Sequence, residues 1–300
     1  MKNLLKVAVL AALLLPVACN NKETKPEDKG ETLPPSTLTK PAQADHACVI
    51  TVPQDQAPVV EVGEEFVGKL IRWINAPSGR YIAEFEVVED KATKATTIIR
   101  LTGTYTYSDG VYNCSGDFNG TIEYDSENGE LIVSPDGEED VTIPASQQPT
   151  TTSGENETNA CRTWTIAKID LNLDKPAINH PFPDGTYKAN SPYDIATYLK
   201  NHSVNVNPDK LKGYDVTEIT LYPGVNMVQV SFTGKESYYG NFTLSGNNLK
   251  YDLKEFIKED LFSGEANCEL TFTGNNCLAK VSVKTEKLTG SATITLAEKK

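Results

Sequence analysis

The side chains that could do acid–base, nucleophilic or metal chemistry are thinly spread along this sequence. None of the three histidines, His46, His180 and His202, has a second histidine or a cysteine at the spacing of zinc ligands. A GxSxG nucleophile elbow, a GxxxxGK[ST] phosphate loop and a dinucleotide fingerprint are all absent from the sequence. Acidic runs such as residues 138–140 are typical of solvated turns. We therefore predict no catalytic constellation, no metal site, no cofactor and no enzymatic activity.

Two cysteines lie close together in the sequence, but their spacing argues against a disulfide between them. Cys268 and Cys277 flank a segment that reads as a hairpin turning at Gly274-Asn275. That register places Cys277 opposite Phe272 and puts Cys268 roughly 13 Å further along the strand. A disulfide needs Cα atoms within about 7 Å. We predict that both cysteines are small buried apolar residues.

Cys19 follows an apolar run at residues 7–15. This run is too short for a transmembrane helix, which needs about 20 residues. It predicts a cleaved leader over residues 1–18. The stretch before Cys19 resembles the bacterial lipoprotein signal, although Pro16 stands where leucine is usual. This resemblance implies that Cys19 is acylated and that the lipid holds the protein on the outer membrane of a Gram-negative cell. Which face of that membrane it occupies stays open. The alternative is an ordinary secretory leader cleaved near Ala18.

Five cysteines are left once Cys19 is used for lipid, an odd number without a CxxC pair. A Cys48–Cys114 disulfide and the state of Cys161 stay open, as does the oligomeric state.

The charge balance restricts the partners. The formal net charge is −13, and without the leader's two lysines 26 Lys+Arg face 41 Asp+Glu, which gives −15. Such a chain has no cationic surface to release counterions from nucleic acid or to attract anionic headgroups. We therefore predict no nucleic-acid partner and a membrane contact made through the covalent anchor.

Aromatic side chains are the better candidates for ligand contacts, since the sequence holds 13 Tyr and 2 Trp. Trp164 could form the floor of a pocket, and Tyr238-Tyr239 must place one ring on each face of a strand. These three are the candidate ligand-binding residues. Other tyrosines either stack on sugar rings or fill a β core, where aromatics are favoured: Tyr105, Tyr107, Tyr112 and Tyr124.

Period-2 alternation of apolar residues predicts an all-β chain with two antiparallel β modules. The first module carries six or seven strands. The second carries eight strands, enough for a small barrel or sandwich, and one helix at residues 193–202 with Ser191 as its cap and Asp194 completing a capping box. Segments poor in large apolar residues predict a tether and a linker between modules that fold independently. The predicted parts are a leader (1–18), a disordered tether (19–45), an N-terminal β module (46–146), a linker (147–160) and a C-terminal β domain (161–300).

Several short motifs run through both modules: Cys161-Arg162-Thr163-Trp164, residues 194–201 before Lys212-Gly213-Tyr214, Ser237-Tyr238-Tyr239-Gly240 with Leu244-Ser245-Gly246-Asn247, and the strand at residues 102–107. With these motifs the chain resembles the lipocalin-like (calycin-like) lipoproteins of the Bacteroidetes. The resemblance implies a lipocalin-like eight-stranded C-terminal barrel and a cell-surface address. It implies no catalytic residues.

Two functions compete. The favoured one is a non-catalytic cell-envelope lipoprotein that binds a small apolar molecule or a glycan in its C-terminal barrel. The alternative is a structural or partner-protein interaction lipoprotein with a filled barrel. A void below ~300 Å³, the lower end for ligand pockets, would exclude the small molecule. The predicted inward residues are Trp164, Ile166, Val228, Val230, Phe232, Phe242, Leu244, Leu270, Phe272 and Val281, with Leu199 closing one end.

Overall fold

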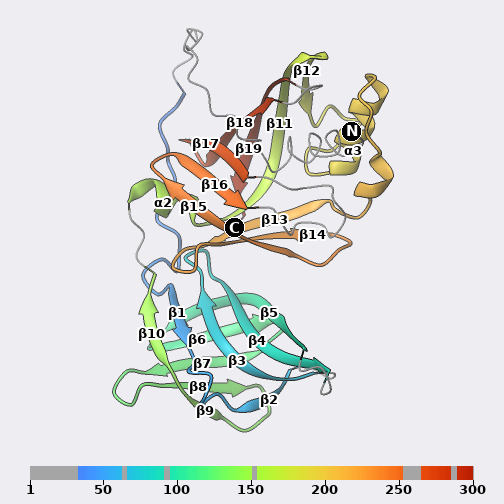
Figure 1. Cartoon of the computed structure of the whole chain (residues 1–300). Helices are drawn as coiled ribbons and strands as arrows, with labels where there is room; N and C mark the ends of the chain where they lie inside the picture. The colour runs from blue at the N-terminus through green and yellow to red at the C-terminus, as the bar shows by residue number, and fades with distance from the viewer. Residues whose placement is uncertain are drawn as a thin grey trace. The chain divides into compact units, whose positions relative to one another are not determined.

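Figure 1 shows the computed structural model, which describes residues 33–62, 66–90, 95–150, 154–252, 265–284 and 289–299. Cys19 and the predicted leader lie outside these residues. As predicted, the described chain is all-β, and it divides into two compact units. Unit 1 combines the described residues up to Thr39 with Glu155–Leu221 and those from Asn226 onward. Unit 2 combines Lys40–Gly154 with Tyr222–Val225.

Unit 2 is an antiparallel sheet of ten strands, more than the six or seven predicted. The order is β10-β1-β3-β4-β5-β6-β7-β8-β9, and β2 pairs with β3 beside that path. Only Ala145 separates β9 from β10, so one stretch of chain leaves β8 and joins β1, which returns the sheet onto itself. The strands are β1 Cys48–Thr51, β2 Val59–Val62, β3 Phe66–Asn75, β4 Arg80–Asp90, β5 Ala95–Ser108, β6 Val111–Gly116, β7 Gly120–Asp125, β8 Glu130–Pro135, β9 Val141–Pro144 and β10 Ser146–Pro149.

The core of unit 2 follows from alternation along β4. Tyr81, Ala83 and Val87 point inward and are buried, while Glu84 points to the opposite face. Trp73 stacks on Tyr81 with ring centroids 4.9 Å apart. Large aromatic side chains therefore fill the interior of this unit.

Unit 1 is a closed barrel built from the eight predicted strands. Strands β13 to β19 pair in sequence order, and β11 closes the ring by pairing with β19 on one edge and with β13 on the other. A β-bulge interrupts the β11–β19 register between Ile166 and Lys168. The strands are β11 Thr163–Lys175, β12 Ala177–Phe182, β13 Val216–Tyr222, β14 Met227–Phe232, β15 Tyr238–Ser245, β16 Asn248–Asp252, β17 Glu265–Thr273, β18 Asn276–Lys284 and β19 Thr289–Glu298.

A ninth strand, β12, pairs with the second half of β11. No strand was predicted there, because the segment before the helix is rich in Pro and Asn. All the residues predicted to face inward belong to the core of unit 1 or pack against it.

The predicted helix is present as α3, Pro192–Asn201, and its cap corrects one detail. The Ser191 hydroxyl accepts from the Asp194 N–H at 3.3 Å, as expected. The Asp194 carboxylate accepts from the Lys188 N–H at 2.8 Å and so joins the preceding loop to the helix. Two short helices were not predicted, α2 at Glu155–Ala160 and the 3₁₀ helix η1 at Pro208–Leu211.

The structure differs from the predicted tether and linker. Within residues 147–160, β10 pairs with β1, and α2 forms the last six residues. Within the predicted tether of residues 19–45, the described part from residue 33 makes backbone hydrogen bonds to unit 1 up to Thr39. Both stretches are held through main-chain groups, which a polar side-chain composition does not reveal.

Candidate functional site

Among the described residues of unit 1, large apolar side chains occupy most of the barrel interior. A cavity of about 50 Å³ lies inside the barrel, and its lining is almost entirely apolar. Trp164, Tyr238, Cys268, Cys277 and Leu270 are among its lining residues. For scale, a water molecule in liquid water occupies about 30 Å³. The cavity is far smaller than a ligand pocket, which has a volume of ~300 Å³ or more.

Two of the three candidate aromatic residues, Trp164 and Tyr238, line this small cavity, and Tyr239 does not. Trp164 is 1% exposed, and its indole N–H donates to the Ala160 carbonyl oxygen at 2.9 Å. Tyr238 lines the cavity. Tyr239 lies on the other face of β15, where its hydroxyl accepts from the Gln229 side-chain amide at 3.4 Å. As predicted, Tyr238 and Tyr239 place one ring on each face of the strand.

The tyrosines considered for sugar stacking belong to the core of unit 2. Tyr105 and Tyr112 are buried, and Tyr107 and Tyr124 pack against the same core. Tyr112 meets Tyr105 and Tyr107 edge to face, with ring centroids 5.6 and 4.8 Å apart. Packing of the core therefore accounts for these rings.

The described cysteines are free and buried. Cys277 pairs with Phe272 and Cys268 with Val281, which confirms the predicted hairpin register. Burial raises the pKa of the Cys268 thiol to about 12, and burial also raises that of Cys277. Thiols in this state stay protonated near neutral pH and are poor nucleophiles and poor metal ligands.

The disulfide left open between Cys48 and Cys114 is not formed. The Cys48 sulfur lies 3.2 Å from the Tyr112 hydroxyl oxygen. Burial raises the pKa of Cys114 to about 12 and also raises that of Cys161. These thiols therefore serve as packing and hydrogen-bonding groups.

One end of unit 1 is covered by an extended segment, Pro34–Thr39, which we call the strap. Ser36 forms a parallel bridge with Gly274 in the β17–β18 turn. The Thr37 N–H donates to the Gly274 carbonyl oxygen at 2.9 Å, and the Gly274 N–H donates to the Pro35 carbonyl oxygen at 3.0 Å. Leu38 packs against the barrel core. The strap is thus held by backbone hydrogen bonds around a single isolated β-bridge.

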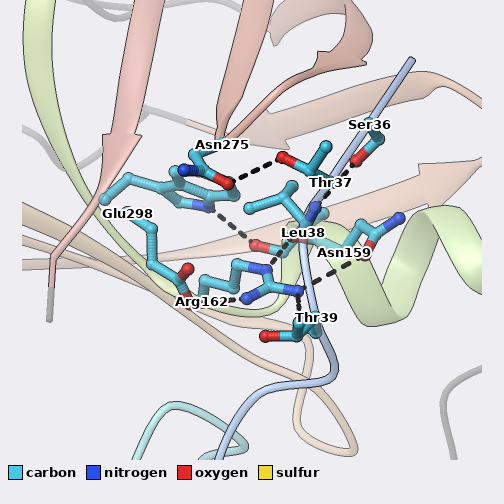
Figure 2. A network of polar contacts seen from close by, with 10 residues as sticks. Ser36, Thr37, Leu38, Thr39, Asn159, Arg162, Asn275 and Glu298 are labelled. Atoms are coloured by element: carbon cyan, nitrogen blue, oxygen red, sulfur yellow. Dashed lines mark hydrogen bonds and ion pairs between the residues drawn. The ribbon is translucent and has the colours of Figure 1, made fainter.

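Arg162 fixes the end of the strap (Figure 2). It is 1% exposed, and its guanidinium lies between the strap, α2 and β19. Its Nη1 pairs with the Glu298 carboxylate at 2.5 Å, its Nε donates to the Asn159 carbonyl oxygen at 3.0 Å, and its Nη2 donates to the Thr39 carbonyl oxygen. Through these hydrogen bonds the buried guanidinium holds the strap, α2 and β19 together.

Two histidines, one on β12 and one at the end of α3, pack against the same tyrosine of α3. His180 and His202 stack on Tyr198 with ring centroids 4.0 and 4.1 Å away, so they cover its opposite faces. The two rings are then roughly 8 Å apart, too far for one Zn²⁺ bonded at about 2.0–2.1 Å to each nitrogen. His180 also bonds the Asp184 carboxylate at 2.9 Å. Within the part of the chain that the structure describes, no group of three or more metal-ligating side chains occurs.

Backbone N–H donors lower the pKa of Asp184. Tyr187 and Thr186 each donate an N–H to this carboxylate at 2.8 Å, and with His180 they lower the pKa of Asp184. Sequence analysis missed this cluster because β12 was not predicted. The one sign of this cluster in the sequence is the spacing of Tyr198 and His202, which are four residues apart and therefore on the same face of a helix.

The comparisons with known proteins add little. No family model and no curated protein matches this sequence. A solved structure described as a porin-like protein from Bacteroides uniformis is similar over 89% of this chain and 99% of that chain. The identity is 10% and the TM-score is 0.20, which carries no argument about function.

Among the described residues, no helix has the length and apolar character needed to cross a bilayer.

Proposed function

We propose that this chain is a lipid-anchored protein of the cell envelope that acts through its outer surfaces, as a structural or partner-binding protein, and not by holding a small molecule inside its barrel. The size of the void carries this proposal. A cavity of about 50 Å³ is well below the ~300 Å³ at which ligand pockets begin. Barrels of about eight strands can be filled by side chains, and large apolar residues fill this one.

The proposal includes acylation of Cys19 and a place on the outer membrane. It is supported by the apolar run before Cys19 and by the sequence resemblance to lipocalin-like lipoproteins of the Bacteroidetes. We also propose that the protein is non-catalytic. Its described thiols are buried, and the rings of His180 and His202 are packed against Tyr198.

Fractionation of cells tests the anchor. Replacing Cys19 by Ala should move the protein from the membrane to the soluble fraction and abolish labelling by a fatty-acid probe. The matched control is Cys114→Ala, which removes a buried thiol and should leave both properties unchanged. Membrane association of the Cys19→Ala variant at the wild-type level would contradict lipid anchoring.

Native mass spectrometry tests the filled barrel. The mature chain with Cys19→Ala, purified from cells without denaturation, should show the mass of the polypeptide alone or of its protein complexes. A stable small-molecule adduct that is lost when Leu270 in the cavity is replaced by Trp would restore the ligand-binding hypothesis. Glu123→Lys, on the exposed face of β7, is the control for that substitution.

A further inference from the structure

Exposed aliphatic side chains are concentrated on one face of unit 2. Where the structure describes burial, four large apolar residues are strongly exposed: Leu33, Val59, Val67 and Ile98. Three of these lie on β2, β3 and β5 of a single sheet, with 61% of Val59, 55% of Val67 and 40% of Ile98 exposed. Scattered apolar residues need no explanation, whereas a cluster on one face indicates an interaction surface.

The strand register places two of these residues at the ends of one row. Across β2, β3, β4 and β5 (Figure 1), Val59 pairs with Lys69, Lys69 with Glu86, and Glu86 with Ile98. Val67 lies two residues from Lys69 and therefore faces the same side. We call Val59, Lys69, Glu86 and Ile98 the β2–β5 row. It reads apolar, positive, negative, apolar.

The charges beside this row remove a barrier to self-association. The next row on the same face is Arg72, Glu84 and Arg100, in which both arginines bond the Glu84 carboxylate, at 2.5 and 2.8 Å. The two rows together carry three cations and two carboxylates. These two rows therefore carry a formal charge of only +1, three cations minus two carboxylates, in a chain of net charge −13. Two copies repel each other least through such a face.

We propose that the β2–β5 row binds the same row of a second copy about a two-fold axis. Rotation by 180° reverses the row, so Val59 meets Ile98 of the second copy and Lys69 meets Glu86 of the second copy. Every contact then occurs twice, as a two-fold interface requires. Lys69 donates one of its three hydrogens to the Gln54 carbonyl oxygen, 3.1 Å away, which leaves capacity for a carboxylate.

This inference rests on the proposed function, because it assigns binding to an outer surface, and it names the partner as a second copy. Four strands at about 4.8 Å spacing give a row only about 14 Å long, so the interface is small and weak in solution. A lipid anchor would strengthen it by confining both copies to one surface.

Charge swapping tests the two-fold geometry. The mature chain with Cys19→Ala is examined by sedimentation equilibrium over a wide concentration range at low salt. Wild type should self-associate to a dimer. Lys69→Glu and Glu86→Lys should each raise the dimer dissociation constant at least tenfold, because like charges then face each other twice. An equimolar mixture of these two variants should associate within about threefold of wild type, since each Glu then meets a Lys.

The controls separate binding from folding. Glu123→Lys makes the same charge change on exposed β7 and should leave the dimer unchanged. Trp73 fluorescence checks that each variant is folded, because Trp73 lies in the core of unit 2. A wild type that stays monomeric at the highest concentration, or variants that fail to associate when mixed, would overturn the proposed dimer. Binding of other proteins by a monomer would leave the proposed function standing.

Discussion

Replacing Arg162 by Met removes the buried cation that joins the strap, α2 and β19. The guanidinium donates to Thr39, Asn159 and Glu298 while only 1% of the residue is exposed. Methionine fills the volume of the aliphatic stem and brings no donor. Because all these partners belong to unit 1, we expect that unit 1 loses stability and that unit 2 does not.

The expected loss of stability follows from the groups that Arg162→Met leaves without a hydrogen-bond partner. Asn159 is 8% exposed, and the loss of the donor to its carbonyl oxygen costs about 1–3 kcal/mol. The charge-assisted bond to Glu298 is worth about 1.5–3 kcal/mol, but the Glu298 side chain is 26% exposed and its carboxylate regains water. Thr39 is exposed, so its carbonyl also returns to water. The free energy of unfolding of unit 1 should therefore fall by about 2–4 kcal/mol.

Two tryptophans allow each unit to be followed separately, because Trp164 lies in the core of unit 1 and Trp73 in that of unit 2. Urea unfolding of the Trp73→Phe chain reports unit 1 by fluorescence, and that of the Trp164→Phe chain reports unit 2. Lys168→Met removes an exposed ion pair with Asp170, 2.9 Å long, from β11, the strand that begins directly after Arg162, and should cost about 0–1 kcal/mol. A loss below about 1 kcal/mol for Arg162→Met, or an equal shift in unit 2, would refute the reasoning.

Three further predictions concern unit 1 and the thiols. Asp184→Asn should lower the stability of unit 1 most above pH 3.8, the ordinary pKa of this carboxyl, and the difference from wild type should vanish as pH falls through the lower folded pKa; a difference independent of pH would contradict this. Ala279→Val should fill part of the cavity and raise the stability of unit 1 by about 0.5–1 kcal/mol, and a loss would mean that the void cannot accept two methyl groups. A thiol reagent at pH 8 should label the native mature protein negligibly and the urea-unfolded protein fully, and rapid native labelling would show that burial does not protect these residues: Cys48, Cys114, Cys161, Cys268 and Cys277.

Strand positions in unit 1 could be predicted from the sequence because short turns fix the register. A hairpin that turns at Gly274-Asn275 leaves one possible partner for each following residue. Gly274 has φ 51°, which glycine adopts without strain. The predicted pairing of Cys277 with Phe272 is therefore confirmed. The inward residues follow at once, since alternate residues share a face.

Other features could not be predicted, because they depend on contacts between distant residues. The stack of His180, Tyr198 and His202 needs β12 and α3 to meet, and their sequence separation gives no sign of it. The size of the cavity depends on how side chains from eight strands interdigitate. Knowing which residues point inward does not give the volume that their side chains leave unfilled.

The strap shows why composition alone misplaced a boundary. A segment rich in Pro, Ser and Thr cannot bury enough apolar surface to order itself, and this is why it reads as a tether. Here the acceptors and donors are mainly backbone groups: carbonyl oxygens of Pro34, Pro35 and Thr39 accept hydrogen bonds from the barrel, and the Thr37 N–H donates to it. Arg162 thereby gathers partners from residues 39, 159 and 298, so the domain that begins near Cys161 is completed by a segment more than 100 residues earlier in the chain. A barrel expressed from residue 161 alone would lack both the strap and α2, and it would leave a buried guanidinium with Glu298 as its remaining partner in this network.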